Sequence, residues 1–240
     1  MHAPHKGSGR IEFVCNPKLN GQIPTPERAS RFIPDWFRRL DRKLELAKGE
    51  EGPSLTIRAC MPVADAFSLG FMLPLAFDLE IEVPEDRRNI KTRWAEDLPF
   101  DLIVPHHPGQ IGSPAAPFED AMPLKFINPW RIKVPEGYSV LFSPPLGRPD
   151  LPFTSFSGVV DCDRFDTTVN IPFVWTGPAG SHRLKAGTPI AQCIPIDRNA
   201  TIKNHVSRAS NAQELDEQAR ANDRKYNEEG AYTRDWRVKK

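Results

Sequence analysis

The chain of 240 residues is long enough to bury a core in one β-rich domain, with or without an appendage. Its 32 basic and 31 acidic residues leave a formal charge of +1, so we expect no strong nucleic-acid binding. No apolar run approaches the roughly 18 residues that span a bilayer. The start of the chain lacks the apolar segment of a signal peptide, and the four cysteines form no CxxC pair. We therefore expect no membrane partner and a cytoplasmic setting.

The first third of the chain predicts two strands and one helix between them. The strands lie near residues 11–15 and 54–60, and the apolar period changes to a helical one at about 35–48. Asp35 is placed to cap the start of this helix, and Gly49 can take the left-handed position after its end. The apolar face consists of Trp36, Phe37, Leu40, Leu44 and Ala47. We expect this face to pack on the main sheet rather than to bind a partner.

The clearest strand runs over residues 75–83, where apolar and polar residues alternate strictly. Asp78, Glu80 and Glu82 share its outer face. They form either a carboxylate cluster for metal or acid/base chemistry or the solvated face of a half-buried strand, and we favour the second interpretation.

Residues 87–126 are rich in proline and glycine and predict a long ordered loop. His106, His107 and Gln110 lie in it, where ligands are often held. Neighbouring histidines on an extended segment point to opposite sides, so at most one would face a given site. A hydrogen-bonding or surface role is the alternative, and we favour it.

The second half restores the β pattern. Strands are predicted at 130–134 and 138–143, joined as a hairpin by the turn "PEG", and then at 168–175 and 189–196. Together these elements predict a mainly antiparallel β domain over residues 1–205 with one flanking helix. Residues 206–240 form a charged helical extension with little apolar area. We expect it to lean on the domain or on a partner through Tyr232 and Trp236.

The order of motifs in residues 138–196 resembles the trimeric dUTPase and dCTP deaminase superfamily. The strand "YSVLFS", the turn "SGVVDCDRF", the strand "TTVNIPFVW" and the segment "GTPIAQ" occur in the family's order. A wider likeness, through "CMPVADAFSLGF", "INPWRIKVPEGYSVLF" and "GVVDCDRF", is to an uncharacterised family of bacteriophage and bacterial proteins. The first resemblance implies a β-clip core and a trimer in which Asp161 faces a neighbouring subunit.

The resemblance also implies a site. Asp161 matches the carboxylate that contacts the sugar 3′-hydroxyl or orients the attacking water, and Gly158 matches the glycine of the turn. The family's phosphate-holding Arg-Ser-Ser has no counterpart, because Arg148 is followed by Pro149 and Asp150, and an acid repels a triphosphate. The closing C-terminal arm of the family is also replaced by the charged helical segment.

A ligand site would form where Asp161, Arg148 and the loop with His106, His107 and Gln110 converge, a set suited to a polar small molecule or nucleotide. The alternative is that Asp161 only caps its own turn. Cys162 lies between two acids, which raise the pKa of its thiol, so we interpret it as structural. No metal-binding spacing occurs, and the sequence leaves the cofactor unknown.

Two functions of different class remain. The first is a phage-type protein that uses a dUTPase-like β frame as a binding or assembly module, in the virion or the host cytoplasm. The alternative is a nucleotide-processing enzyme of the dUTPase or dCTP deaminase kind. Charge-assisted hydrogen bonds to phosphate contribute about 1.5–3 kcal/mol each. The missing phosphate clamps therefore favour the first.

Overall fold

The computed structural model describes residues 9–45, 55–119, 121–200, 202–228 and 230–238. The chain divides into two compact units, Met1–Asn199 and Ala200–Lys240. The domain boundary predicted after residue 205 falls inside the second unit.

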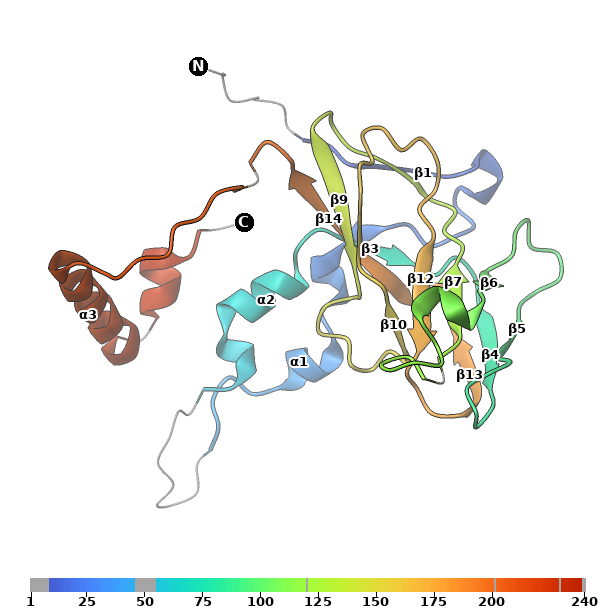
Figure 1. Cartoon of the computed structure of the whole chain (residues 1–240), viewed down its shortest axis with the longest axis horizontal. Coiled ribbons are helices and arrows are strands. Elements are labelled where there is room, and N and C mark those ends of the chain that lie inside the picture. Colours follow the sequence, from blue (N-terminus) through green and yellow to red (C-terminus); the bar gives the residue numbers. More distant parts are fainter. Residues whose placement is uncertain (1–8, 46–54, 120, 201, 229, 239–240) are drawn as a thin grey trace. The chain divides into compact units, whose positions relative to one another are not determined.

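The described residues of the first unit form four antiparallel sheets (Figure 1). The largest has the order β11-β9-β14-β3-β2, with bounds Gly158–Val160, Tyr138–Ser143, Pro189–Asp197, Phe71–Pro74 and Glu27–Arg28. The second has the order β10-β12-β7-β6, with bounds Phe153–Ser155, Ile171–Trp175, Pro123–Phe126 and Ile103–Pro105. The third, β13-β4-β5, contains Gly180–Leu184, Leu79–Val83 and Lys91–Arg93, and the fourth pairs β1 (Glu12–Val14) with β8 (Arg131–Lys133). The predicted mainly β, antiparallel fold class is confirmed.

Helices are short in the first unit. The α-helices are α1 (Asp35–Arg39) and α2 (Met61–Phe67), and short 3-10 helices cover Pro17–Leu19, Ala29–Phe32, Ile57–Ala59 and Pro108–Ile111. The second unit contains α3 (Ala212–Asn227) and a π-helical turn at Tyr232–Trp236. None of the helices in the described ranges is long and apolar enough to cross a membrane.

One buried apolar cluster joins the four sheets of the first unit. At its centre the ring of Phe126 stacks on Phe173, with ring centroids 3.9 Å apart. Phe153 meets both rings edge-on, at 5.0 and 5.5 Å. Aromatic pairs of this kind add about 0.5–1.5 kcal/mol each beyond the area they bury. The cluster therefore holds the strands rigidly while their ends carry the polar groups described below.

Several predicted strands are confirmed close to their bounds, namely those at 11–15, 130–134, 138–143 and 189–196. The strand predicted at 75–83 begins later, at Leu79. Leu75 instead exchanges backbone hydrogen bonds with the turn before β14, at Gly187 and Thr188. The chain passes here from β3 in one sheet to β4 in another, which also buries Ala76 on the face predicted to be outer.

The predicted strand at 54–60 is wrong, and the helix predicted at 35–48 is too long. Ile57–Ala59 form a 3-10 turn that leads into α2. α1 ends at Arg39, and residues 40–45 are not helical. Their backbone pairs with the segment before α2, because Arg58 donates to the carbonyl of Leu40 (3.0 Å) and the N–H of Thr56 to Arg42 (3.0 Å). Ala47 and the cap proposed at Gly49 lie outside the described residues.

The long loop predicted over residues 87–126 and the hairpin predicted at 130–143 are also wrong. The loop region contains β5, β6 and β7, and the prolines of β6 and β7 stand at strand ends, where a missing N–H costs little. β8 pairs with β1, whereas β9 pairs with β11 and β14. The tight turn at Gly137, with φ +87°, sends the two strands into different sheets.

The predicted helix of the second unit is confirmed as α3. Asn211 and Glu214 form a reciprocal capping box, with both hydrogen bonds at 2.9 Å. α3 has no buried residue, and the guanidinium of Arg224 lies 5.5 Å from the ring centroid of Trp236. Docking of this unit through Tyr232 and Trp236 stays a prediction.

Candidate functional site

The carboxylate of Asp161 is held in place from two neighbouring strands. Asp161 follows β11 directly, and its Oδ1 accepts hydrogen bonds from Ser139 Oγ of β9 (2.6 Å) and from Arg198 Nη1 after β14 (3.3 Å). The side chain remains 60% exposed. The turn itself is closed by the backbone carbonyl of Asp161, which accepts from the N–H groups of Arg164 and Phe165. Asp161 thus presents a fixed acceptor to solvent, and its side chain bonds across strands rather than to its own turn.

Arg198 and Asp163 form an ion pair at this turn, in which the aspartate is buried and the arginine is partly exposed. The side chain of Asp163 is only 2% exposed and pairs with both terminal nitrogens of Arg198. It also accepts from the N–H of Gly137 (2.9 Å). The hydrogen bond from Arg198, followed by the one from Gly137, lowers the pKa of Asp163 to about 2 despite the burial. Arg198 donates further to the carbonyl of Tyr138 (2.8 Å), so one guanidinium fastens three segments together.

Cys162, between the two acids, is buried. Burial first, and the charges of Asp163 and Asp161 after it, raise the pKa of its thiol to about 11. The predicted rise is found, but burial contributes more than the neighbouring acids. A thiol with this pKa is a poor nucleophile.

Arg148 lies in the loop between β9 and β10 and is engaged by its own neighbour. Its Nε and Nη2 donate to the two oxygens of Asp150, at 2.8 and 2.6 Å, and lower the pKa of that carboxyl. The Arg148 side chain is 17% exposed. The loop is fixed at Gly147, whose carbonyl accepts from Trp36 Nε1 (2.8 Å). The guanidinium is therefore already neutralised.

The two histidines follow β6 and have different hydrogen-bond partners. His106 Nδ1 lies 2.7 Å from Gln110 Oε1, so the ring donates to the amide oxygen. Its Nε2 is buried and has no hydrogen-bond partner among the described residues. His107 Nδ1 accepts the N–H of Gly109 (3.1 Å) and thereby caps the short helix Pro108–Ile111.

Gly158 begins β11 opposite Phe142. A side chain would be tolerated there, because its φ is not left-handed and no residue beyond its two chain neighbours has an atom within 4 Å of the Cβ position. Across the described residues, no hydrogen bond or ion pair connects the Asp161 turn, the Arg148 loop and the His106 loop. Their convergence on one ligand stays a prediction.

Three residues of this region were not identified from the sequence: Ser139, Arg198 and Gln192. Gln192 of β14 is fully buried, and its amide donates to the carbonyls of Leu69 (2.6 Å) and Ala66 (3.2 Å) while accepting from Leu146 N–H (3.1 Å). It connects α2 and the Arg148 loop to the central strand. Gln192 stands in the segment "GTPIAQ", which marks its strand but does not indicate its partners.

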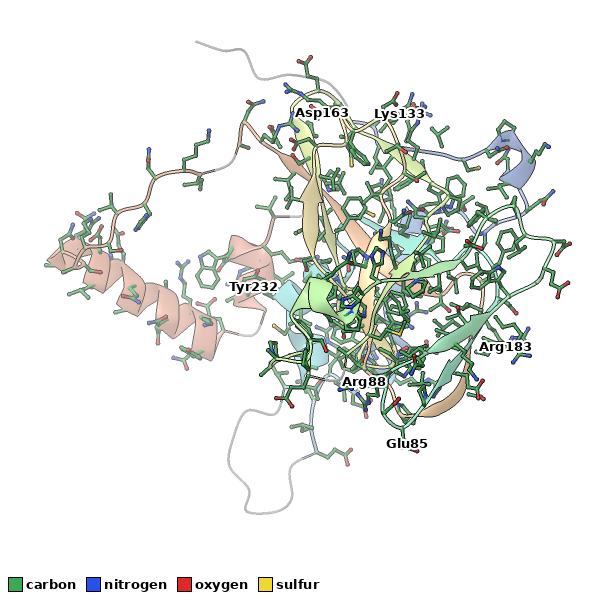
Figure 2. All side chains as sticks on the ribbon, turned by 45° about the vertical axis from the view of Figure 1, so that its right-hand side comes forward. Glu85, Arg88, Lys133, Asp163, Arg183 and Tyr232 are labelled. Carbon is green, nitrogen blue, oxygen red and sulfur yellow. The ribbon has the colours of Figure 1, made fainter. Side chains whose placement is uncertain are left out.

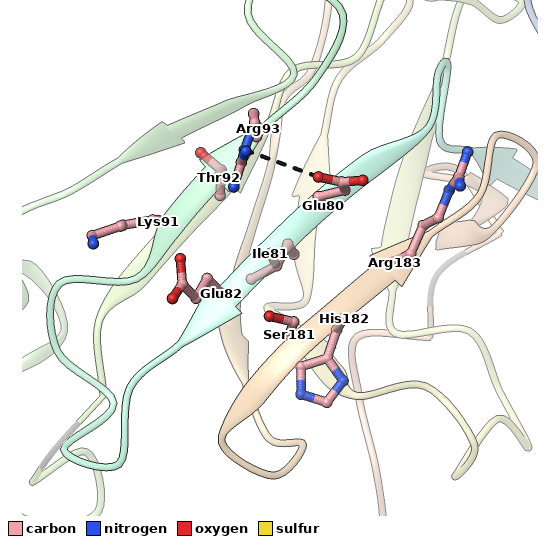
Figure 3. Close-up of a pocket in the computed structure, with 9 residues that line it drawn as sticks. All are labelled: Glu80, Ile81, Glu82, Lys91, Thr92, Arg93, Ser181, His182 and Arg183. Carbon is pink, nitrogen blue, oxygen red and sulfur yellow. Dashed lines mark ion pairs between the residues drawn. The ribbon is translucent and has the colours of Figure 1, made fainter.

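The acidic face of β4 is a solvated, ion-paired surface, as we favoured. Arg183 of β13 bonds to Asp78 (2.5 Å), and Arg93 of β5 lies 3.9 Å from Glu80, as Figure 3 shows for the second pair. A hollow of about 590 Å³ lies over these three strands. In the described part of the chain, no three metal-ligating side chains are grouped.

The sequence matches no protein-family model and no curated protein. Its structure is similar to EIAV dUTPase, with 11% identity, a TM-score of 0.33, and coverage of 71% of this chain and 94% of that one. It is also similar to the dUTPase of Staphylococcus bacteriophage 80alpha, with 11% identity, a TM-score of 0.37, and coverage of 85% and 99%. A mutant dUTPase from phage phi11 of S. aureus gives 9% identity, a TM-score of 0.38, and coverage of 86% and 99%. The resemblance to dUTPases thus recurs in the structure, but at these identities no individual side chain receives a role from it.

Proposed function

We propose that this chain is a non-enzymatic binding module that assembles into homo-oligomers, with a trimer as the expected form. Its recognition surface would be the outer edge of β11 together with the Asp161 turn. A phage-type assembly role, in the virion or the host cytoplasm, agrees with such a module.

The open edge of β11 carries this proposal. β11 is the end strand of its sheet, Val159 is 62% exposed, and the strand contains no charge and no proline. Proteins commonly protect such edges with charged residues, as β13 does with Arg183. An edge without that protection can pair with a strand of another subunit.

The two arginines of this region already have acidic partners, which supports a binding role rather than catalysis. Arg148 is neutralised by Asp150, and Arg198 is shared among two acids, the backbone carbonyl of Tyr138 and the hydroxyl of Ser139. A triphosphate would have to displace an internal carboxylate to reach either guanidinium. Each lost contact of this kind removes about 1.5–3 kcal/mol of binding.

The test is light scattering at micromolar concentration on the wild type and on Val159→Lys. We expect the wild type to be an oligomer and the variant to fall apart, because a lysine opposes strand pairing. Val14→Lys, at an exposed valine of β1 (38%), is the matched control and should leave the oligomer intact. A monomeric wild type, or an oligomeric Val159→Lys, would contradict the proposal.

A nucleotide-processing enzyme is the second candidate, and the exposed carboxylate of Asp161 favours it. Fixed by Ser139 and Arg198, this carboxylate is suited to accept a hydrogen bond from a sugar hydroxyl. A thermal-shift screen of deoxynucleotides on the wild type and Asp161→Ala tests this. A ligand at 100 times its Kd stabilises the native state by about 2.7 kcal/mol. If no deoxynucleotide shifts the wild type, this second candidate is to be dropped.

A further inference from the structure

A second hollow adjoins the one in Figure 3 and is built differently. It has a volume of about 520 Å³ and shares Glu80, Arg93 and Arg183 with the first. From there it extends to the loop after β5, where Trp94 and Leu98 line it. We call it the Trp94 hollow. It lies on a different sheet from β11, and Figure 2 shows Arg183 and Asp163 on different sides of the first unit.

The far end of the Trp94 hollow is apolar. Phe77, Trp94 and Leu98 pack against the core with part of their surface and line the hollow with the rest. Phe77 is supported from behind by the ring of Phe100, with centroids 6.1 Å apart. The remaining apolar lining is Ala76, Ala95 and Ala186. The alanines leave room between the larger apolar side chains. The volume of the hollow falls in the range of small-molecule sites, about 300–1,000 Å³.

The charges at the other end of the hollow are not equivalent. Asp78 accepts the N–H of Ala186 (2.9 Å) and a hydrogen bond from Arg183 (2.5 Å), and these two bonds, the first more than the second, lower the pKa of Asp78. Arg183 and Asp78 therefore already neutralise each other. Arg93 has an ion pair with Glu80 at 3.9 Å, which is too long for a hydrogen bond, and its side chain is 79% exposed. Its fork of N–H donors is open to a ligand.

From this arrangement we propose that the Trp94 hollow binds a small planar aromatic acid. The ring lies against Trp94 and Phe77, above the alanines, and the acidic group receives paired hydrogen bonds from Arg93. A single negative charge fits best, because Asp78 and Glu80 border the hollow and would repel a dianion or a phosphate chain.

The experiment uses two probes of equal shape, 2-naphthoate and its neutral amide, 2-naphthamide, titrated calorimetrically into the full chain. We expect the wild type to bind the acid at least about tenfold more tightly than the amide. In Arg93→Gln this preference should disappear while the weaker amide binding persists. Arg10→Gln is the matched control, since Arg10 is also exposed (82%) and only loosely paired, with Glu12 at 3.4 Å.

A second variant tests the apolar half. Ala95→Leu adds volume at an exposed position of the hollow and should abolish binding of both probes, with the melting temperature confirming that the protein is folded. The proposal is overturned if the wild type binds neither probe at millimolar concentration. It is equally overturned if Arg93→Gln keeps the preference for the acid, or if Ala95→Leu, when folded, binds as the wild type does.

Discussion

The Asp161 turn and the Arg148 loop each contain an aspartate that is paired with an arginine, yet the two pairs connect different parts of the chain. Asp163 is 2% exposed, and its partner Arg198 joins three segments that are distant in sequence. Asp150 is 51% exposed and lies two residues from Arg148. Removing one member of an ion pair costs most when it leaves a buried charge without its partner, as it would leave Asp163. A local pair whose carboxylate is half exposed, such as Asp150, mainly shapes its own loop.

The largest loss of stability should come from removing Arg198, the partner of the buried Asp163. Arg198→Ala leaves Asp163 buried with a single hydrogen-bond donor, the N–H of Gly137. Breaking such a pair costs on the order of 3 kcal/mol. Urea unfolding measures this loss, and a change below about 1 kcal/mol would contradict the importance given to the pair.

A smaller loss is expected where the Arg148 loop is fixed, at Gly147. This residue has φ +73°, and a Cβ would stand 2.4 Å from the ring of Phe67. Gly147→Ala therefore combines left-handed strain with a clash, together on the order of 2 kcal/mol. Gly158→Ala, at a glycine with open space, is the control and should change the unfolding free energy little.

The stability contributed by the Arg198–Asp163 pair should depend on pH. The pKa of Asp163 is about 2 in the folded chain, below the usual value of about 3.9. The ionised carboxylate therefore adds stability above pH 4, and this contribution is lost as the pH falls from about 4 to about 2. The free energy of unfolding of Asp163→Asn should converge with that of the wild type over this interval. A gap that is unchanged from pH 6 to pH 2 would show that Asp163 does not titrate in this way.

The smallest effect should come from Arg148→Ala. Asp150 is half exposed and recovers water when its partner is removed, so the loss should be about 1 kcal/mol, mainly from packing of the arginine stem. If this variant were as destabilised as Arg198→Ala, the distinction between the two pairs would fail.

The sequence predicted the features that depend on local pattern. The strands at 130–134, 138–143 and 189–196 and the helix with Asn211 and Glu214 follow from period and capping, and the structure has them. The strand pairing that the sequence predicted, between 130–134 and 138–143, is wrong. The residues at 135–137 are typical of a hairpin turn, but in the structure this turn sends β8 and β9 to different sheets. The local sequence does not record that choice.

The same limit applies to the candidate site. Asp161 was selected from the motif around it, and its role in a site stays a prediction. Ser139 and Arg198 were missed, because they lie 22 and 37 positions away and meet Asp161 only through the order of the strands. α1 is shorter than the helix predicted at 35–48 for a related reason. The backbone of residues 40–42 accepts hydrogen bonds from the segment before α2, and the periodicity of the sequence does not reveal such contacts.

The position of β14 has a consequence for how the protein is made. Although β14 is the last strand of the first unit in sequence, it is the central strand of its sheet, between β9 and β3. During synthesis the facing edges of β9 and β3 therefore remain without their partner until residue 197 has left the ribosome. Unpaired strand edges invite association with other chains. The nascent chain thus passes through a vulnerable interval that ends when Arg198 follows β14 out and closes on Asp163.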